Sequence, residues 1–285
     1  FKDVVDGKVA KVYGTDKEFT LAATGAATGS TVTYESTDTN VATVDGTGKV
    51  TIKGAGTAVI KATASATDDY AEGVATYELT VNKKTLEAAD LEFTSDSTFA
   101  KEYDGDTTCT TATVQIRSAA KVNQSDVLPT VTGTYAYDSK DVKGATKVTF
   151  TSERTENTNY ILPANLTVDH AASITPAELE SSGTAAAEAT YNTRVKDISI
   201  SGLTVKMKNT SATVDGTWAW AASAAVDDVP NVGTTTEYQA VFTPTSDADN
   251  YQPLTVNICP TINAADGVSK GSVERTQKFT DENPK

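Results

Sequence analysis

The sequence is poor in the residue types on which most catalytic and metal sites depend. Its 285 residues include one histidine, two cysteines and one methionine. A single histidine leaves no His/Cys cluster for zinc and only one candidate base for a Ser-His-Asp set. The sequence also has no nucleophile elbow and no Walker loop. We therefore expect no catalytic residue, no metal site and no cofactor, and we expect that the chain is not an enzyme.

Long hydrophobic runs and positive charge are scarce as well. No run of about 18 apolar residues exists, so we expect no membrane insertion. Lys plus Arg is 24 and Asp plus Glu is 38, and the resulting charge of −14 argues against nucleic acid as a partner. The two cysteines, Cys109 and Cys259, are expected to be free thiols, with a bridge between domains as the open alternative. Because the chain starts at Phe1 and has no signal-peptide pattern, we expect it to be a piece of a longer protein.

Alternating apolar and polar residues fill much of the first part of the chain. Such period-two runs, broken by Gly, Asp and Asn, are typical of half-buried strands joined by tight turns. The abundant Thr, Ser, Ala and Val favour the same structure, since long amphipathic helices need more Leu, Glu and Lys. The expected strands in this part are 18–22, 31–34, 49–52, 58–62 and 77–81.

Two tyrosine landmarks recur three times along the chain. One tyrosine opens each copy, and 57, 57 and 60 residues later a second tyrosine precedes a Leu-Thr-Val strand. The closing valines of these strands, Val81, Val168 and Val256, stand 87 and 88 residues apart. Regular spacing of this kind indicates one structural unit repeated. The opening tyrosines are Tyr13, Tyr103 and Tyr191, and the closing tyrosines are Tyr70, Tyr160 and Tyr251.

The first copy resembles the group-two bacterial immunoglobulin-like domain. The resemblance rests on the run Ser36 to Asp45, on Gly48-Lys49-Val50, and on Gly54-Ala55-Gly56-Thr57-Ala58. It covers nearly the whole copy and implies a β-sandwich from a bacterial surface protein.

The second and third copies resemble related repeats of bacterial surface proteins. Lys101-Glu102-Tyr103-Asp104-Gly105-Asp106-Thr107 is similar to the opening of the YDG repeat family, and Asn159-Tyr160 to its ending. The third copy matches the Ig-like repeats of Gram-positive surface proteins more loosely. The resemblances imply a secreted or cell-surface location in a bacterium, of the Gram-positive kind.

These observations predict an all-β protein of three tandem Ig-like β-sandwich domains in an elongated array. The expected boundaries are 1–82 for the group-two Ig-like domain, 83–172 for the YDG-type domain, 173–265 for the related Ig-like domain and 266–285 for a polar tail. We name the three domains the first, second and third repeats.

Aromatic pairs on single strand faces are the main candidates for ligand contact. Trp218 and Trp220 share one face, as do Tyr135 and Tyr137 83 residues earlier. Exposed aromatic rows can stack on sugar rings, so these four are candidate glycan contacts. Packing in the core is the favoured interpretation, because Val214 and Val131 have the same parity as the aromatic residues that follow them.

The remaining candidates carry weaker signals. His170 ends a strand beside a predicted junction, and we expect it to pack between the second and third repeats. The closing tyrosines are expected to be corner residues with buried rings and hydroxyls bonded to backbone. Asp247, Asp249 and Asn250 form an oxygen cluster without the spacing of a full calcium loop.

The predicted function is a non-catalytic stalk or spacer in a bacterial surface or secreted protein, with a contribution to adhesion. The expected partners are flanking domains of a longer chain, together with an extracellular glycan or a host or cell-wall protein. The alternative is a glycan-binding accessory module of an adhesin or a carbohydrate-active enzyme. Fold analogy supplies part of this hypothesis.

Overall fold

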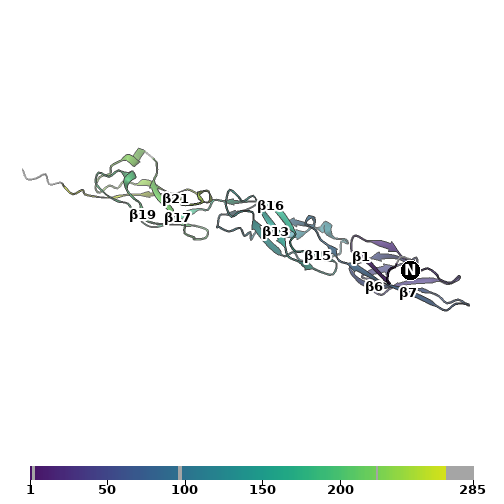
Figure 1. Ribbon diagram of the computed structural model, residues 1–285. Coiled ribbons are helices and arrows are strands. Elements are labelled where there is room, and N and C mark those ends of the chain that lie inside the picture. Colours follow the sequence, from purple (N-terminus) through teal and green to yellow (C-terminus); the bar gives the residue numbers. More distant parts are fainter. Residues whose placement is uncertain (2–3, 96–97, 223, 268–285) are drawn as a thin grey trace, which may run out of the picture. The chain divides into compact units, whose positions relative to one another are not determined.

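The computed structural model describes residues 1, 4–95, 98–222 and 224–267, so most of the predicted tail lies outside the described residues. Strands and short 3-10 turns make up the regular structure of the described part (Figure 1). The chain divides into two compact units, one of residues 1–101 and 105–174, the other of residues 102–104 and 175–285. Each unit is described by itself.

The first repeat, in the first unit, consists of two hydrogen-bonded sheets. One sheet has the strand order β1-β7-β6-β3 and the other β2-β5-β4. The runs expected to be strands from their alternation are strands, which confirms that part of the prediction. The bounds are β1 Lys8–Val12, β2 Glu18–Thr20, β3 Val32–Ser36, β4 Ala42–Val44, β5 Lys49–Ile52, β6 Gly56–Ala64 and β7 Gly73–Asn82.

The core of the first repeat follows directly from the period of two. Alternate residues of β6 and β7 are buried, among them Ile60 and Leu79, and β5 contributes Val50. Residues between them, such as Thr80, are more exposed because successive side chains of a strand point to opposite faces. The alternation therefore selects which face of each sheet is buried.

The second repeat contains a four-stranded sheet of order β10-β16-β13-β12, a pair β11-β9 and a three-stranded sheet β14-β15-β8. Its core includes Phe150 and Val148 of β13 and Leu162 of β15. The bounds are β8 Lys84–Thr85, β9 Leu91–Phe93, β10 Phe99–Glu102, β11 Val114–Ile116, β12 Gly133–Tyr137, β13 Lys147–Ser152, β14 Thr155–Glu156, β15 Tyr160–Leu162 and β16 Thr167–Thr175.

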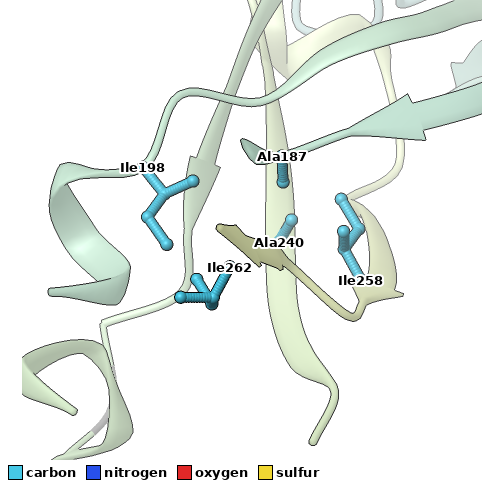
Figure 2. Packing of buried hydrophobic residues seen from close by; sticks show 5 residues of the cluster. All are labelled: Ala187, Ile198, Ala240, Ile258 and Ile262. Atoms are coloured by element: carbon cyan, nitrogen blue, oxygen red, sulfur yellow. The ribbon is translucent and has the colours of Figure 1, made fainter. Parts of the chain in front are cut away.

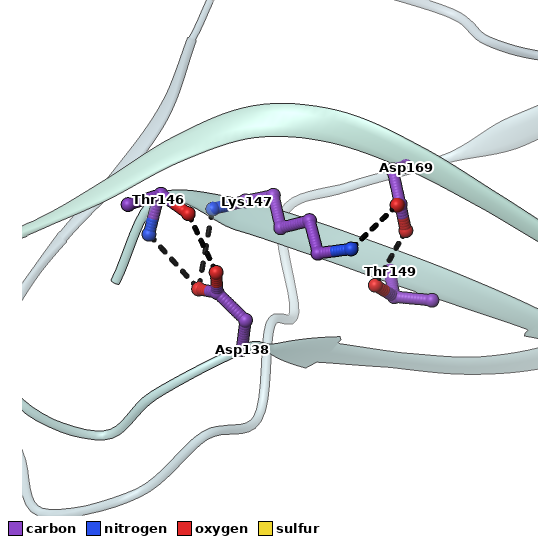
Figure 3. A network of polar contacts seen from close by, with 5 residues as sticks. All are labelled: Asp138, Thr146, Lys147, Thr149 and Asp169. Carbon is purple, nitrogen blue, oxygen red and sulfur yellow. Dashed lines mark hydrogen bonds and ion pairs between the residues drawn. The ribbon is translucent and has the colours of Figure 1, made fainter. Parts of the chain in front are cut away.

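A polar network lies on the exposed face of this sheet (Figure 3). Asp138, just after β12, accepts hydrogen bonds from the hydroxyl and backbone of Thr146 at 2.6 and 2.9 Å, and Asp169 of β16 pairs with the Lys147 ammonium at 2.6 Å. Thr149 also donates to Asp169 at 2.6 Å. These bonds lower the pKa of both carboxyl groups and raise the pKa of Lys147. The Lys147–Asp169 pair is held as two ions, whereas amide formation between them would need a neutral amine.

The third repeat, in the second unit, has a sheet β20-β21-β22 and the pairs β17-β19 and β18-β23. Its core is the cluster Ala187, Ile198, Ala240, Ile258 and Ile262, whose side chains converge in Figure 2. The bounds are β17 Leu179–Ala186, β18 Glu188–Thr190, β19 Ser201–Met207, β20 Gly216–Trp220, β21 Tyr238–Pro244, β22 Leu254–Ile258 and β23 Thr261–Asn263.

These sheets confirm the predicted fold class of tandem all-β sandwiches. Strands pair within each of the three sets of residues, and short 3-10 turns connect several of them. The chain therefore uses local antiparallel pairing together with a parallel pairing of β1 with β7 and of β18 with β23.

Burial predicts how the first repeat responds to matched valine truncations. Val50 is fully buried and Val74 is 55% exposed. We expect Val50→Ala to destabilise the first repeat by roughly 2 kcal/mol, since two methyl groups leave a cavity, and Val74→Ala to have a much smaller effect. Hydrogen exchange of β5 and β6 in the full chain measures both. Equal protection in the two variants would contradict the assigned core.

Candidate functional site: a buried tyrosine contact between repeats

The opening tyrosine of the first repeat is placed by the parallel pairing of β1 with β7. This pairing aligns Val12 with Asn82, and the Tyr13 N–H donates to the Asn82 carbonyl at 2.9 Å. Tyr13 is thereby held where the last strand of the repeat ends. The chain continues into β8 within two residues of Asn82.

The closing tyrosine of the second repeat lies against that same point. Tyr160 begins β15, and β15 pairs in parallel with β8 so that Tyr160 is aligned with Lys84. The rings of Tyr13 and Tyr160 pack edge to face, with centroids 5.9 Å apart and planes at 79°. Tyr13 is 1% exposed and Tyr160 is 0% exposed. Both lie in the first compact unit, so two distant tyrosines form one buried contact between consecutive repeats.

Both buried hydroxyls bond to the same carboxylate. Tyr13 Oη donates to Asp126 Oδ2 at 2.8 Å, and Tyr160 Oη donates to the same oxygen. Each hydroxyl also accepts a bond, Tyr13 from Asn123 Nδ2 at 2.7 Å and Tyr160 from the Val122 backbone N–H at 2.8 Å. Every polar atom of the two phenols is therefore satisfied, as burial of polar groups requires.

This arrangement shifts the ionisation of all three side chains. Burial, with the hydrogen bond to Asp126 and its negative charge, raises the pKa of Tyr13 to about 12. Burial and the bond to Asp126 likewise raise the pKa of Tyr160. Burial alone would raise the pKa of Asp126, but hydrogen bonds from Tyr160, the Asn123 backbone and Tyr13 outweigh it and lower that pKa. At neutral pH the cluster is one carboxylate anion between two neutral phenols.

Close backbone approach completes the contact. Asn159, which precedes the closing tyrosine, accepts a hydrogen bond from the Ala55 N–H of the first repeat at 2.9 Å. Gly14 has φ +86°, and a Cβ there would lie 2.4 Å from Val122 Cγ2. A larger residue at position 14 would both strain the backbone and push the second repeat away. An open hollow of about 610 Å³, lined by residues including Asp16, lies beside the contact.

The second unit contains the same pairing of landmarks. Tyr103 and Tyr251 pack edge to face with centroids 5.5 Å apart and planes at 82°. The Tyr103 N–H donates to the Thr175 carbonyl at 2.8 Å, and Ala177 is aligned with Tyr251 in a parallel bridge. The Tyr103 carbonyl accepts a bond from Asn209 Nδ2 at 2.8 Å. An opening tyrosine therefore packs on the next closing tyrosine in both units.

The sequence analysis identified the tyrosines but assigned them the wrong partners. A buried corner role within each repeat is wrong for Tyr70, which is 64% exposed. It is incomplete for Tyr160, whose ring packs on a different repeat. Asp126, Asn123 and Asn159 were missed as members of the site. The signal that could have pointed to Asn159 is that an asparagine precedes the closing tyrosine in two of the three copies.

The aromatic rows lie against cores. Trp218 and Trp220 pack against the cluster of Figure 2, in ring contact with Phe242 and Tyr238, and Trp220 Nε1 donates to the Ile198 carbonyl at 2.7 Å. The Trp218 Nε1 is buried and has no hydrogen-bond partner among the described residues.

The tyrosine row of the second repeat is placed in the same way. Tyr137 is buried, and Tyr135 is half-buried against Phe150 and donates from its hydroxyl region toward the backbone by accepting the Val114 N–H at 3.0 Å. Burial and ring contacts favour packing for all four residues, and glycan contact through them stays a prediction.

The histidine prediction is wrong in its location. His170 does not pack between the second and third repeats: its ring lies 5.1 Å from those of both Phe93 and Phe99, within the first unit. The reason is strand parity, which turns His170 of β16 toward the rings of β9 and β10. The two cysteines are free thiols, Cys109 buried and Cys259 exposed.

The structure gives no positive evidence for a metal or membrane site. No group of three or more His, Cys, Asp or Glu side chains suited to a metal ion occurs in the part of the chain that the structure describes. Asp247 and Asp249 instead flank a 3-10 turn, in which Asp247 has φ +53°. In residues 1–267, apart from the few not described, no helix has the length and apolarity needed to cross a membrane.

Two family models match the chain. Residues 12–67 match the intimin immunoglobulin-like domain, and residues 82–168 match the YDG domain. No curated protein sequence matches. These matches agree with the resemblances found in the sequence and are consistent with a non-catalytic extracellular or adhesive module.

Several solved structures are distantly similar. One, Drosophila N-cadherin EC1-3, is 11% identical, with a TM-score of 0.26 and coverage of 90% of this chain and 98% of that chain. Protocadherin Gamma B2 domains 3-6 are 11% identical, with a TM-score of 0.30 and coverage of 90% and 71%. Domains 4-9 of surface layer protein SbsC are 14% identical, with a TM-score of 0.19 and coverage of 86% and 42%.

Acid is expected to weaken the tyrosine contact. Because the folded pKa of Asp126 is lowered, its carboxylate stabilises the folded state above the unfolded pKa, near the ordinary value of about 3.9, and this contribution is lost as pH falls through the folded pKa. Asp126→Asn should lower the protection of β1 and β15 at neutral pH and reduce its further loss in acid. Hydrogen exchange, corrected for intrinsic pH dependence, measures both. Asp169→Asn, outside the contact, is the matched control, and an undiminished acid effect in Asp126→Asn would contradict the assignment.

The tryptophan row gives a separate test. Trp218→Ala with Trp220→Ala should destabilise the third repeat by about 3 kcal/mol or more, because both rings pack against its core. Circular dichroism in urea and hydrogen exchange of β21 measure the loss, and Val232→Ala at an exposed position is the control. A double variant that unfolds like the parent but loses binding on a glycan array would show that the row is a sugar platform.

Proposed function

Since the chain carries bacterial Ig-like and YDG repeats, we propose that it is a non-catalytic stalk or spacer segment of a bacterial cell-surface or secreted protein. Its repeats hold a flanking module at a distance from the surface and contribute to adhesion by presenting it. The partners are flanking domains of a longer chain, and the adhesive partner is an extracellular glycan or a host or cell-wall protein. A Gram-positive source remains a prediction from the resemblance of the third repeat.

The observation that carries this proposal is the buried contact of Tyr13, Tyr160 and Asp126. A spacer needs joints that resist bending, because a freely jointed chain would not hold its load at a defined distance. The connection after Asn82 is only two residues from β8, and β8 is itself paired with β15. This connection leaves no flexible tether between the first and second repeats.

Surface chemistry supports the same function. A net charge of −14 favours solubility and low nonspecific binding, which suits a segment that separates other modules. Glycan binding by the predicted aromatic rows has no structural observation in its favour, since these rings pack against cores. The spacer is therefore preferred to the glycan-binding alternative.

Trypsin cleavage between the repeats tests whether the joint is closed. Lys83 and Lys84 are the cleavage sites in the connection, and Lys84 donates from its ammonium to the Ala120 carbonyl at 2.7 Å. Tyr160→Ser removes the ring contact and the shared hydrogen bond, so we expect cleavage at Lys83–Lys84 in the folded full chain to rise roughly tenfold, with a smaller rise for Tyr160→Phe. Mass spectrometry identifies and times each cut.

Two further variants keep the test specific. Gly14→Ala should raise cleavage at the same site, because it opens the contact from the first repeat without touching the core of the second. Tyr191→Ser, at an exposed tyrosine, should leave it unchanged. The proposal fails if Tyr160→Ser and Gly14→Ala are as resistant as the parent. It also fails if cuts at Lys101 and Arg117 rise as much as those in the connection.

A further inference from the structure

The third opening tyrosine is built like the other two but its ring is exposed. The Tyr191 N–H donates to the Asn263 carbonyl at 2.8 Å, as Tyr13 and Tyr103 donate to the last residues of their final strands. β18, which leads to Tyr191, runs parallel to β23, as β1 runs parallel to β7. Yet Tyr191 is 46% exposed, against 1% for Tyr13 and 6% for Tyr103.

The turn after this tyrosine also has the geometry of an occupied contact. Asn192 has φ +81° and Gly14 has φ +86°, at the same position relative to their tyrosines. A left-handed residue other than glycine is uncommon and strained, so its presence indicates that this turn is a required feature. Tyr191 therefore occupies a preformed position, and its exposure reflects the missing ring opposite it.

The path of the chain defines where that ring would come from. In both occupied contacts, the backbone two residues after the last strand residue pairs with the closing tyrosine: Lys84, two after Asn82, with Tyr160, and Ala177, two after Thr175, with Tyr251. The residue two after Asn263 is Ala265, which is exposed and lies outside any strand. Tyr191 and Ala265 thus correspond to the two elements that receive a closing tyrosine elsewhere.

We propose that Tyr191 and Ala265 form a docking face for the closing-tyrosine end of a further Ig-like repeat joined directly after Asn263. The occupant is a repeat in which a tyrosine begins a strand and follows an asparagine, as in Asn159-Tyr160 and Asn250-Tyr251. Its ring packs edge to face on Tyr191, and its strand pairs in parallel with the backbone at Ala265. The contact extends the array, and it can exist whether or not the chain is a spacer.

A second copy of the chain is the competing occupant. Tyr70 is 64% exposed, and its carbonyl accepts from the Thr67 N–H as the Tyr160 carbonyl does from Asn157, so the end of the first repeat resembles a vacant closing position. The tethered repeat is favoured, because the parallel pairing in both occupied contacts uses the connecting chain itself. A short tether also raises the effective concentration to the order of mM, which a single ring contact between separate copies lacks.

Hydroxyl-radical footprinting of tyrosines tests the proposal. The full chain is compared with an extended chain in which residues 83–175 are repeated directly after Asn263, in the place they have after Asn82. We expect the oxidation of Tyr191 to fall in the extended chain to the level of Tyr103, with Tyr70 unchanged as the internal control. Changing the closing tyrosine of the added copy to serine should restore the oxidation of Tyr191.

The opposite results are equally clear. The proposal is overturned if Tyr191 is oxidised equally in both chains while circular dichroism and hydrogen exchange show that the added copy is folded. It is also overturned if Tyr191 and Tyr70 of the unextended chain become protected together as its concentration rises, because that result assigns the face to a second copy. Neither result bears on the trypsin test of the connection after Asn82.

Discussion

A buried phenol must find partners for its hydroxyl, and in this protein that requirement joins consecutive repeats. An unsatisfied buried hydroxyl costs about 1–3 kcal/mol, so Tyr13 and Tyr160 could not be buried together without an acceptor between them. Asp126 supplies one oxygen to both hydroxyls, while Asn123 and the Val122 N–H donate back to them. Loss of the carboxylate would leave two buried donors without their acceptor, which makes this contact specific as well as stable.

The same constraint explains why the tyrosines are spaced as they are. Each opening tyrosine is fixed to the end of its own final strand, and the chain then passes directly beside the next closing tyrosine. The ring contact therefore depends on two backbone positions that recur once per repeat. Spacings of 57, 57 and 60 residues are the trace of this geometry in the sequence.

Strand positions and core faces could be read from the sequence, because alternation reports burial directly. The strands of the first repeat and the inward faces of Trp218 and Trp220 follow from parity alone. The contact could not be read in this way, since its two rings belong to residues 147 positions apart, 13 and 160, and no local pattern pairs them. Asp126 stands in a connection without periodicity, where nothing in the sequence separates a structural carboxylate from a solvated one. The location of His170 failed for a related reason: parity gave its face but not which rings lay opposite.

The central claim is that the first and second repeats are held as one body by this contact. Backbone ¹⁵N relaxation of the full chain, with Asp126→Ala as comparison, tests it most directly. In the parent, strands β6 and β13 should fit one common rotational diffusion tensor, and in Asp126→Ala they should need two. Two independent tensors already in the parent would contradict the account.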